Sequence, residues 1–196
     1  MPHIALPEDL PGITSGFAFR PETARPMREL AHTLLHTSGN EGFSSRDREL
    51  IAAFVSSRNT CYFCQTSHAA AASHLNGGDA DLVASVCHDY RTAPIPDKLK
   101  ALLAIAEQVQ IDGKRVTAQL VAEARHHGAT DLDIHDTILI AAAFCMYNRY
   151  VDGLATVQPQ DPSLYRERGK MVARDGYVAA NLTNVINPPI AEPVTR

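Results

Sequence analysis

Apolar residues recur at helical spacing along most of the chain. They lie three and four positions apart in eight segments, and no alternating run of β-branched residues indicates a strand. Residues 27–91 and 97–158 contain no proline, which is typical of helices because an interior proline costs about 3 kcal/mol. The predicted helices cover about residues 22–37, 45–58, 61–75, 79–88, 99–109, 117–127, 131–150 and 162–175.

These helices predict an all-α protein built as a single-domain bundle of about seven to eight helices. With 196 residues, the chain has the length of one ordinary domain. We expect the helical domain to cover residues 22–178. Residues 1–21 and 179–196 are richer in proline, and we expect them to form an N-terminal and a C-terminal arm.

Composition excludes two classes of partner. The net charge of −4 argues against binding to nucleic acid or to an anionic membrane surface. The most apolar run, residues 138–146, is much shorter than the roughly 20 residues that span a bilayer.

The first twenty residues lack the basic start and apolar core of a secretory signal. Four cysteines are too few for a disulfide scaffold, so we expect a cytoplasmic protein.

Two of the cysteines form a C-x-x-C motif that points to redox or metal chemistry. Cys61, Cys64 and His68 fall at i, i+3 and i+7 of one predicted helix, and these offsets place them on a single face. Near a helix N-terminus, the unpaired N–H groups favour a thiolate. We expect Thr60 to be the N-cap, with both cysteines in or near the first turn.

Glu49 belongs to the preceding predicted helix, yet it can reach His68. If Asn59 and Thr60 form a tight turn between antiparallel helices, Glu49 and His68 both lie roughly 12–15 Å from the turn at 1.5 Å per residue. Glu49 then orients His68, and His68 activates Cys64. This is the logic of a nucleophile, a base and an orienting group.

Other interpretations of the same residues stay open. C-x2-C-x3-H could hold zinc in a non-catalytic helical domain, although a zinc site usually needs a fourth ligand. The cysteine pair could also act as a redox-sensitive structural clip. Of the remaining cysteines, Cys145 in an apolar helix fits a small buried side chain, and Cys87 fits a partly buried structural thiol or a second reactive one.

The segment RDRELIAAFVSSRNTCYFCQTSHAA resembles the core motif of the alkylhydroperoxidase D-like, or carboxymuconolactone decarboxylase-like, superfamily. The pattern is a glutamate, eleven residues, Cys-x-x-Cys, three residues and a histidine. A later segment, YNRYVDGL, is similar to the second helical half of that family. The resemblance extends from about residue 22 to residue 178, and it is best to the subgroup of peroxidase-related enzymes.

The resemblance implies an all-α fold that assembles as a homo-oligomer, a trimer or hexamer, with a dimer as the remaining alternative. It implies a peroxidase acting on hydroperoxides, with Cys64 as the peroxidatic cysteine, Cys61 as the resolving cysteine, and Glu49 and His68 as the proton relay. No organic or metal cofactor is implied. An external dithiol, such as a lipoyl-bearing protein, is expected to reduce the disulfide. A superfamily lyase that uses His68 and Glu49 is a further alternative.

One position departs from the pattern. In the best-known members a second histidine precedes the second cysteine, and this chain has Phe63 there. Loss of that imidazole predicts a slower relay or a different reductant.

Overall fold

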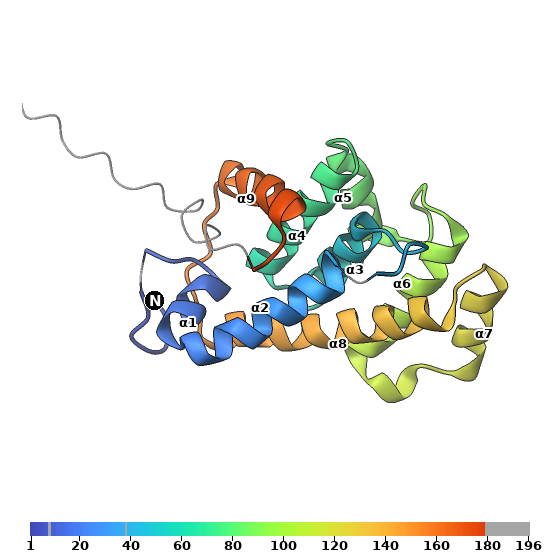
Figure 1. Ribbon diagram of the computed structural model, residues 1–196, viewed down its shortest axis with the longest axis horizontal. Helices are drawn as coiled ribbons and strands as arrows, with labels where there is room; N and C mark the ends of the chain where they lie inside the picture. Colours follow the sequence, from blue (N-terminus) through green and yellow to red (C-terminus); the bar gives the residue numbers. More distant parts are fainter. Residues whose placement is uncertain (8, 38, 179–196) are drawn as a thin grey trace, which may run out of the picture.

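The computed structural model describes residues 1–7, 9–37 and 39–178 (Figure 1). Over these residues the chain forms nine α-helices, one short 3₁₀ helix and no strand, which confirms the predicted all-α class. The predicted C-terminal arm, residues 179–196, lies outside the described residues. The elements are α1 (Ile13–Phe19), α2 (Pro21–Leu35), α3 (Ser45–Arg58), α4 (Tyr62–Leu75), α5 (Ala80–Asp89), α6 (Asp97–Ile111), η1 (Gly113–Arg115), α7 (Ala118–His126), α8 (Asp131–Gly153) and α9 (Pro162–Asp175).

The sequence pattern did not predict α1, so the described chain has more than the expected seven to eight helices. This helix lies within residues 1–21, is only seven residues long and contains Gly16, which costs about 1 kcal/mol relative to alanine in a helix. Helices this short depend on tertiary packing. α1 packs against α2 and α8, and residues 14–16 are buried.

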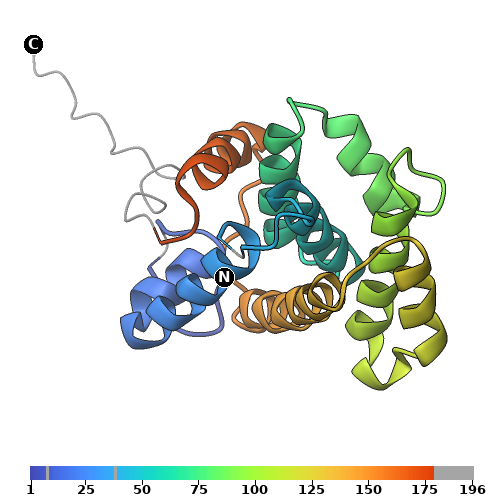
Figure 2. The same ribbon diagram turned by 45° about the vertical axis from the view of Figure 1, so that its right-hand side comes forward.

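α3 is the central helix of the fold. Every residue from 48 to 56 is buried, and the helix packs against α4, α8 and α6. Its N-terminus is set by Ser44, whose side chain accepts a hydrogen bond from the Asp47 N–H at 3.2 Å. Figures 1 and 2 show α3 and α4 in the middle of the molecule, with α1, α2 and α9 on one side and α5, α6 and α7 on the other. Polar residues on α3 therefore lie in the interior.

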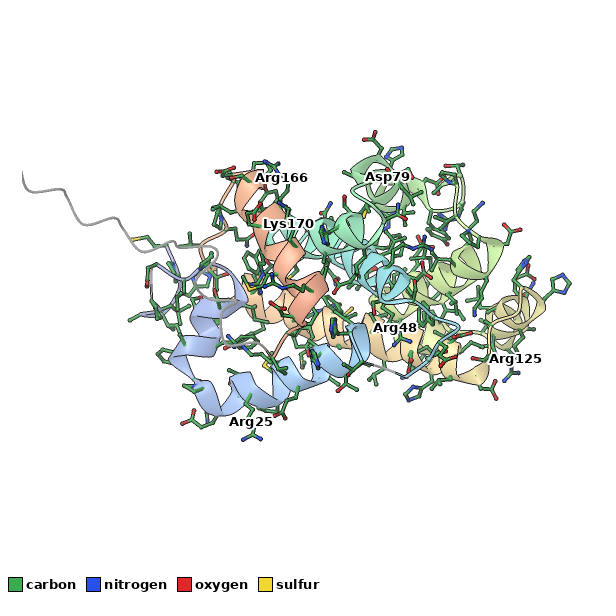
Figure 3. The ribbon with its side chains drawn as sticks, turned by 45° about the horizontal axis from the view of Figure 1, so that its top comes forward. Arg25, Arg48, Asp79, Arg125, Arg166 and Lys170 are labelled. Atoms are coloured by element: carbon green, nitrogen blue, oxygen red, sulfur yellow. The ribbon has the colours of Figure 1, made fainter. Side chains whose placement is uncertain are left out.

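α9 lies very close to α4. A Cβ atom on Gly169 would come within 2.7 Å of the Ala70 backbone, so only glycine permits this approach. Next to this contact, the Tyr165 ring packs edge-on against Phe63, with ring centroids 5.9 Å apart. Arg166 and Lys170 stay exposed on the outer side of α9 (Figure 3). Because of this close packing, the face of α9 opposite to Arg166 and Lys170 lies against α4, and so do the residues that follow α9.

The sequence of α8 contains an apolar stripe, Ile138, Leu139, Ala142 and Met146, that could serve either the core or a subunit contact. Leu139 and Met146 are 37% and 46% exposed, so this part of the stripe does not face the core. Phe144 and Tyr147 do face it. Because residues 138–146 are apolar on all sides of the helix, their periodicity does not select a face. None of the helices in the described part of the chain combines the length and apolar character that a bilayer crossing demands.

Candidate active site

The turn between α3 and α4 brings Glu49 and His68 together. Asn59 and Thr60 connect the two helices, with Thr60 in the left-handed region at φ 57°. The Cys61 N–H closes the turn by donating to the Ser56 carbonyl at 3.1 Å. Across the two helices, Nδ1 of His68 lies 2.8 Å from Oε2 of Glu49. Because both side chains are almost fully buried, water competes little for this hydrogen bond.

Tyr177, which follows α9, completes this cluster. Its hydroxyl donates a hydrogen bond to Oε1 of Glu49 and lies 3.1 Å from Nδ1 of His68. Burial, together with the neighbouring Glu49 carboxylate, raises the pKa of Tyr177 well above its ordinary value. The phenol therefore keeps its proton and acts as a donor. Since Glu49 and Tyr177 both lie at Nδ1, Nε2 is the imidazole nitrogen left for proton exchange.

The two motif cysteines have different surroundings. Cys61, rather than the predicted Thr60, is the N-cap of α4, and Cys64 is its third residue. Cys61 is completely buried, whereas Cys64 lines a cavity that Cys61 does not reach. A hydrogen bond with the Cys64 side chain, and then burial, raise the pKa of Cys61. Cys61 therefore stays a protonated thiol, able to donate to Cys64 when Cys64 is ionised.

The cavity beside Cys64 has a volume of about 50 Å³, enough for a few water molecules or a small ligand. Helices α1, α2, α4, α8 and α9 all contribute to its wall. Most of the lining is apolar, from residues that include Ile13, Phe17, Met27, Phe144 and Val172. The polar lining includes Arg28, Cys64, Ser67, His68, Arg168 and Tyr177. The cavity therefore joins a thiol and a base to a mainly apolar binding space.

Arg168 brings a positive charge to this cavity. Its side chain is 6% exposed, and its guanidinium lies over the Phe63 ring, 5.8 Å from the centroid. Burial lowers the pKa of Arg168, and the neighbouring Arg28 lowers it further. Arg168 therefore places a buried cation in the same cavity wall as Cys64.

The N-terminal segment packs directly against the Phe63 ring, which lines the cavity. Gly12 has φ 55°, and a Cβ atom there would stand 2.3 Å from the Phe63 ring. The position next to Cys64 thus serves as an apolar wall, where the family resemblance would place an imidazole.

The chain was compared with known proteins. Residues 21–108 match the model of the carboxymuconolactone decarboxylase family. A peroxidase-related protein from Silicibacter sp. TM1040, itself uncharacterized, is 28% identical, with a TM-score of 0.69 over 76% of this chain and 77% of the other. Over residues 21–108, and in its fold, this chain is therefore similar to the carboxymuconolactone decarboxylase-like, or alkylhydroperoxidase D-like, superfamily.

Two further structures of this superfamily's fold were found. An uncharacterized peroxidase-related protein from Ralstonia eutropha JMP134, described as an alkylhydroperoxidase AhpD core, is 25% identical, with a TM-score of 0.70 over 80% of this chain and 81% of the other. A protein of unknown function from Agrobacterium tumefaciens is 22% identical, with a TM-score of 0.64 over 74% of this chain and 97% of the other. At that identity it supports the fold alone. No curated protein matches the chain significantly.

The match to the decarboxylase family model includes four predicted site residues: Glu49, Cys61, Cys64 and His68. Arg168 and Tyr177 lie outside the matched segment, and the sequence analysis missed both. Neither residue has a fixed spacing to the motif, since Tyr177 is 128 positions from Glu49. Both residues reach the cavity because α9 packs closely against α4 at Gly169, and no pattern in the sequence predicts that contact.

The other two cysteines lie away from the cavity. Cys87 of α5 lines a separate groove between α4, α5 and α9, and burial raises its pKa. Cys145 of α8 is partly buried, with its sulfur 3.6 Å from the Asn59 side-chain nitrogen. Within residues 1–7, 9–37 and 39–178, no three or more histidine, cysteine or acidic side chains are grouped so that they could hold a metal ion.

Proposed function

We propose that this chain is a thiol peroxidase that reduces hydrogen peroxide or organic hydroperoxides through Cys64 and Cys61. The observation that carries the proposal is the cavity in which Cys64 and His68 meet, with Glu49 bound to Nδ1 of the imidazole. A thiol, a base and a carboxylate that orients the base are the parts of an activated nucleophile. The two relatives described as peroxidase-related, at 28% and 25% identity, support the same reaction class.

In the first step, the Cys64 thiolate attacks the terminal oxygen of the hydroperoxide. A sulfur–oxygen bond forms while the oxygen–oxygen bond breaks, so that sulfur is oxidised to a sulfenic acid and the peroxide is reduced. His68 takes the thiol proton and passes it to the leaving oxygen, which departs as an alcohol or as water. Glu49 stabilises the imidazolium in between. Arg168 lines the same cavity, so its positive charge can stabilise the negative charge that passes from sulfur to the leaving oxygen.

In the second step, the Cys61 thiol attacks the sulfur of the Cys64 sulfenic acid. A disulfide forms, and the oxygen leaves as water together with the Cys61 proton. An external dithiol, for example a lipoyl-bearing protein, then reduces the disulfide by thiol exchange. Hydroperoxide and dithiol supply all the electrons exchanged, so the cycle uses no organic or metal cofactor.

Turnover with dithiothreitol as the reductant tests this assignment. We expect hydroperoxide consumption by the wild type, by Cys87→Ser and by Cys145→Ser, because the last two thiols lie outside the cavity. Cys64→Ser should abolish consumption. Full activity in Cys64→Ser would overturn the proposal. An activity on a lactone or another carbon acid that survives Cys64→Ser would favour the lyase that uses His68 and Glu49.

A further inference from the structure

Ser67 presents a buried hydroxyl for which the described residues offer no hydrogen-bond partner. The residue is 8% exposed and lines the cavity beside Cys64 and His68. Among the described residues, only two buried side-chain polar atoms lack a partner: Oγ of Ser67 and Oγ1 of Thr137. Buried polar groups are almost always paired in folded proteins, so an unpaired one needs an explanation.

The other hydroxyls that line the cavity already have acceptors. Thr14 donates to the Pro11 carbonyl, Tyr147 to the Met27 carbonyl at 3.0 Å, and Tyr177 to Glu49. These groups hold the wall together. Ser67 differs from them because nothing in the described chain accepts its proton. Its hydroxyl is therefore available to a molecule that enters the cavity.

The position of Ser67 on α4 determines what kind of molecule that is. Cys64 lies three residues before it and His68 directly after it, and all three side chains line one cavity. A molecule that reacts with Cys64 and receives a proton from His68 thus lies beside the Ser67 hydroxyl. Its reacting group must contain an oxygen atom that accepts a hydrogen bond.

We propose that the Ser67 hydroxyl binds the peroxide group of the substrate, donating a hydrogen bond to the oxygen that leaves as alcohol or water. This inference rests on the peroxidase function proposed above. Negative charge develops on that oxygen as the oxygen–oxygen bond breaks, and a fixed donor in a water-poor cavity stabilises it. Ser67 then contacts the reacting peroxide together with Cys64 and His68.

The test compares Ser67→Ala with the wild type in two reactions of Cys64. Stopped-flow measurement of Cys64 oxidation by one hydroperoxide should show a second-order rate constant at least about ten-fold lower in Ser67→Ala. Alkylation of Cys64 by iodoacetamide involves no peroxide oxygen, and its rate should not change. Urea unfolding should show Ser67→Ala to be at least as stable as the wild type, because the variant loses a hydroxyl that has no partner among the described residues.

Thr137→Val is the matched control, since it removes the other unpaired hydroxyl, which is fully buried and lies outside the cavity. This variant should oxidise at the wild-type rate. An unchanged oxidation rate in Ser67→Ala, an equal loss in Thr137→Val, slower alkylation or a marked loss of stability in Ser67→Ala would each overturn the role of Ser67. If wild-type Cys64 does not react with hydroperoxides at all, the proposed function itself fails.

Discussion

At the scale of single residues, the site combines groups that the sequence reveals with groups that only the fold reveals. Glu49, Cys64 and His68 follow from local rules, because a helix face and a tight turn set their relative positions. The 2.8 Å contact between Glu49 and His68 agrees with the reach that the Asn59–Thr60 turn predicts. Tyr177 and Arg168 could not be predicted, since they reach the cavity through the packing of a distant helix.

Tyr177 gives a prediction at this scale. Tyr177→Phe removes a hydrogen-bond donor that fixes the position of the Glu49 carboxylate. Glu49 then orients the imidazolium of His68 less well. A hydrogen bond to a charged group contributes about 1.5–3 kcal/mol, and each 1.36 kcal/mol is a factor of ten. We therefore expect the rate constant for Cys64 oxidation to fall about ten-fold or more in stopped-flow experiments.

Tyr90→Phe is the control for this variant. It removes another tyrosine–glutamate hydrogen bond, to Glu107 at 3.1 Å, in a part of the fold that does not line the cavity. This control should keep the wild-type rate. Equal rates in Tyr177→Phe and the wild type would show that the phenol contributes nothing to the relay.

At the scale of the elements, periodicity predicted the eight longer helices, and tertiary contacts decided the rest. α1 forms only because it packs on α2 and α8. The core-facing side of α8 depends on its neighbours, since the middle of the helix is apolar all round. Packing between distant segments decides both features, because it overrides weak local preference.

Arg48 links three elements and should dominate their stability. Its side chain is 2% exposed and donates to the carbonyls of Phe43 at 2.7 Å and Leu34 at 3.0 Å. Its guanidinium also pairs with Asp136 of α8 at 3.4 Å. Because Arg48→Ala leaves a buried carboxylate without this cation, we expect the free energy of unfolding to fall by about 3 kcal/mol in urea titrations.

Arg25→Ala is the matched control, because Arg25 lies on the surface of α2 and pairs there with Glu29 (Figure 3). Exposed pairs of this kind contribute little, so no measurable change in unfolding is expected. If both variants unfold at the same urea concentration, Arg48 does not hold these elements together.

His32 ties the segment after α9 to α2 and makes that attachment sensitive to pH. The Tyr177 N–H donates to Nδ1 of His32 at 3.2 Å, which requires an unprotonated nitrogen. Burial, and then the neighbouring His36, lower the pKa of His32 below its ordinary 6.5. The unfolded chain therefore binds the proton more readily, and the free energy of unfolding decreases as the pH falls below about 6.5.

His32→Gln keeps an acceptor at every pH and should reduce this loss of stability. We expect a smaller difference between urea unfolding at about pH 7.5 and about pH 5.5 in the variant than in the wild type. His126→Gln, on the exposed end of α7, should keep the wild-type difference. Equal acid sensitivity in His32→Gln and the wild type would refute the role of His32.

At the scale of the whole molecule, the fold could be predicted as a class, and its assembly stays a prediction. The helical pattern and the Glu–Cys–Cys–His motif were enough to predict the superfamily, which the family match and the solved relatives bear out. The resemblance also implies a homo-oligomer. Leu132, Leu139 and Met146 lie seven residues apart on the outer face of α8 and are all exposed.

Light scattering coupled to size exclusion measures the assembly directly. We expect a trimer or a hexamer of the 21.3 kDa chain across a wide range of protein concentration. Burial in such an assembly would remove the exposed apolar residues of α8 from water. A protein that stays monomeric at high concentration would contradict the prediction.

The central claim is that Cys64 is oxidised first and Cys61 resolves it, and intact-mass analysis tests it most directly. Reduced wild type and Cys61→Ser are each measured before and after one equivalent of hydroperoxide. The wild type should lose two hydrogen atoms as the disulfide forms. Cys61→Ser should gain one oxygen atom, located on Cys64 by peptide mapping. No mass change in either protein, or an added oxygen on a cysteine other than Cys64, would contradict the account.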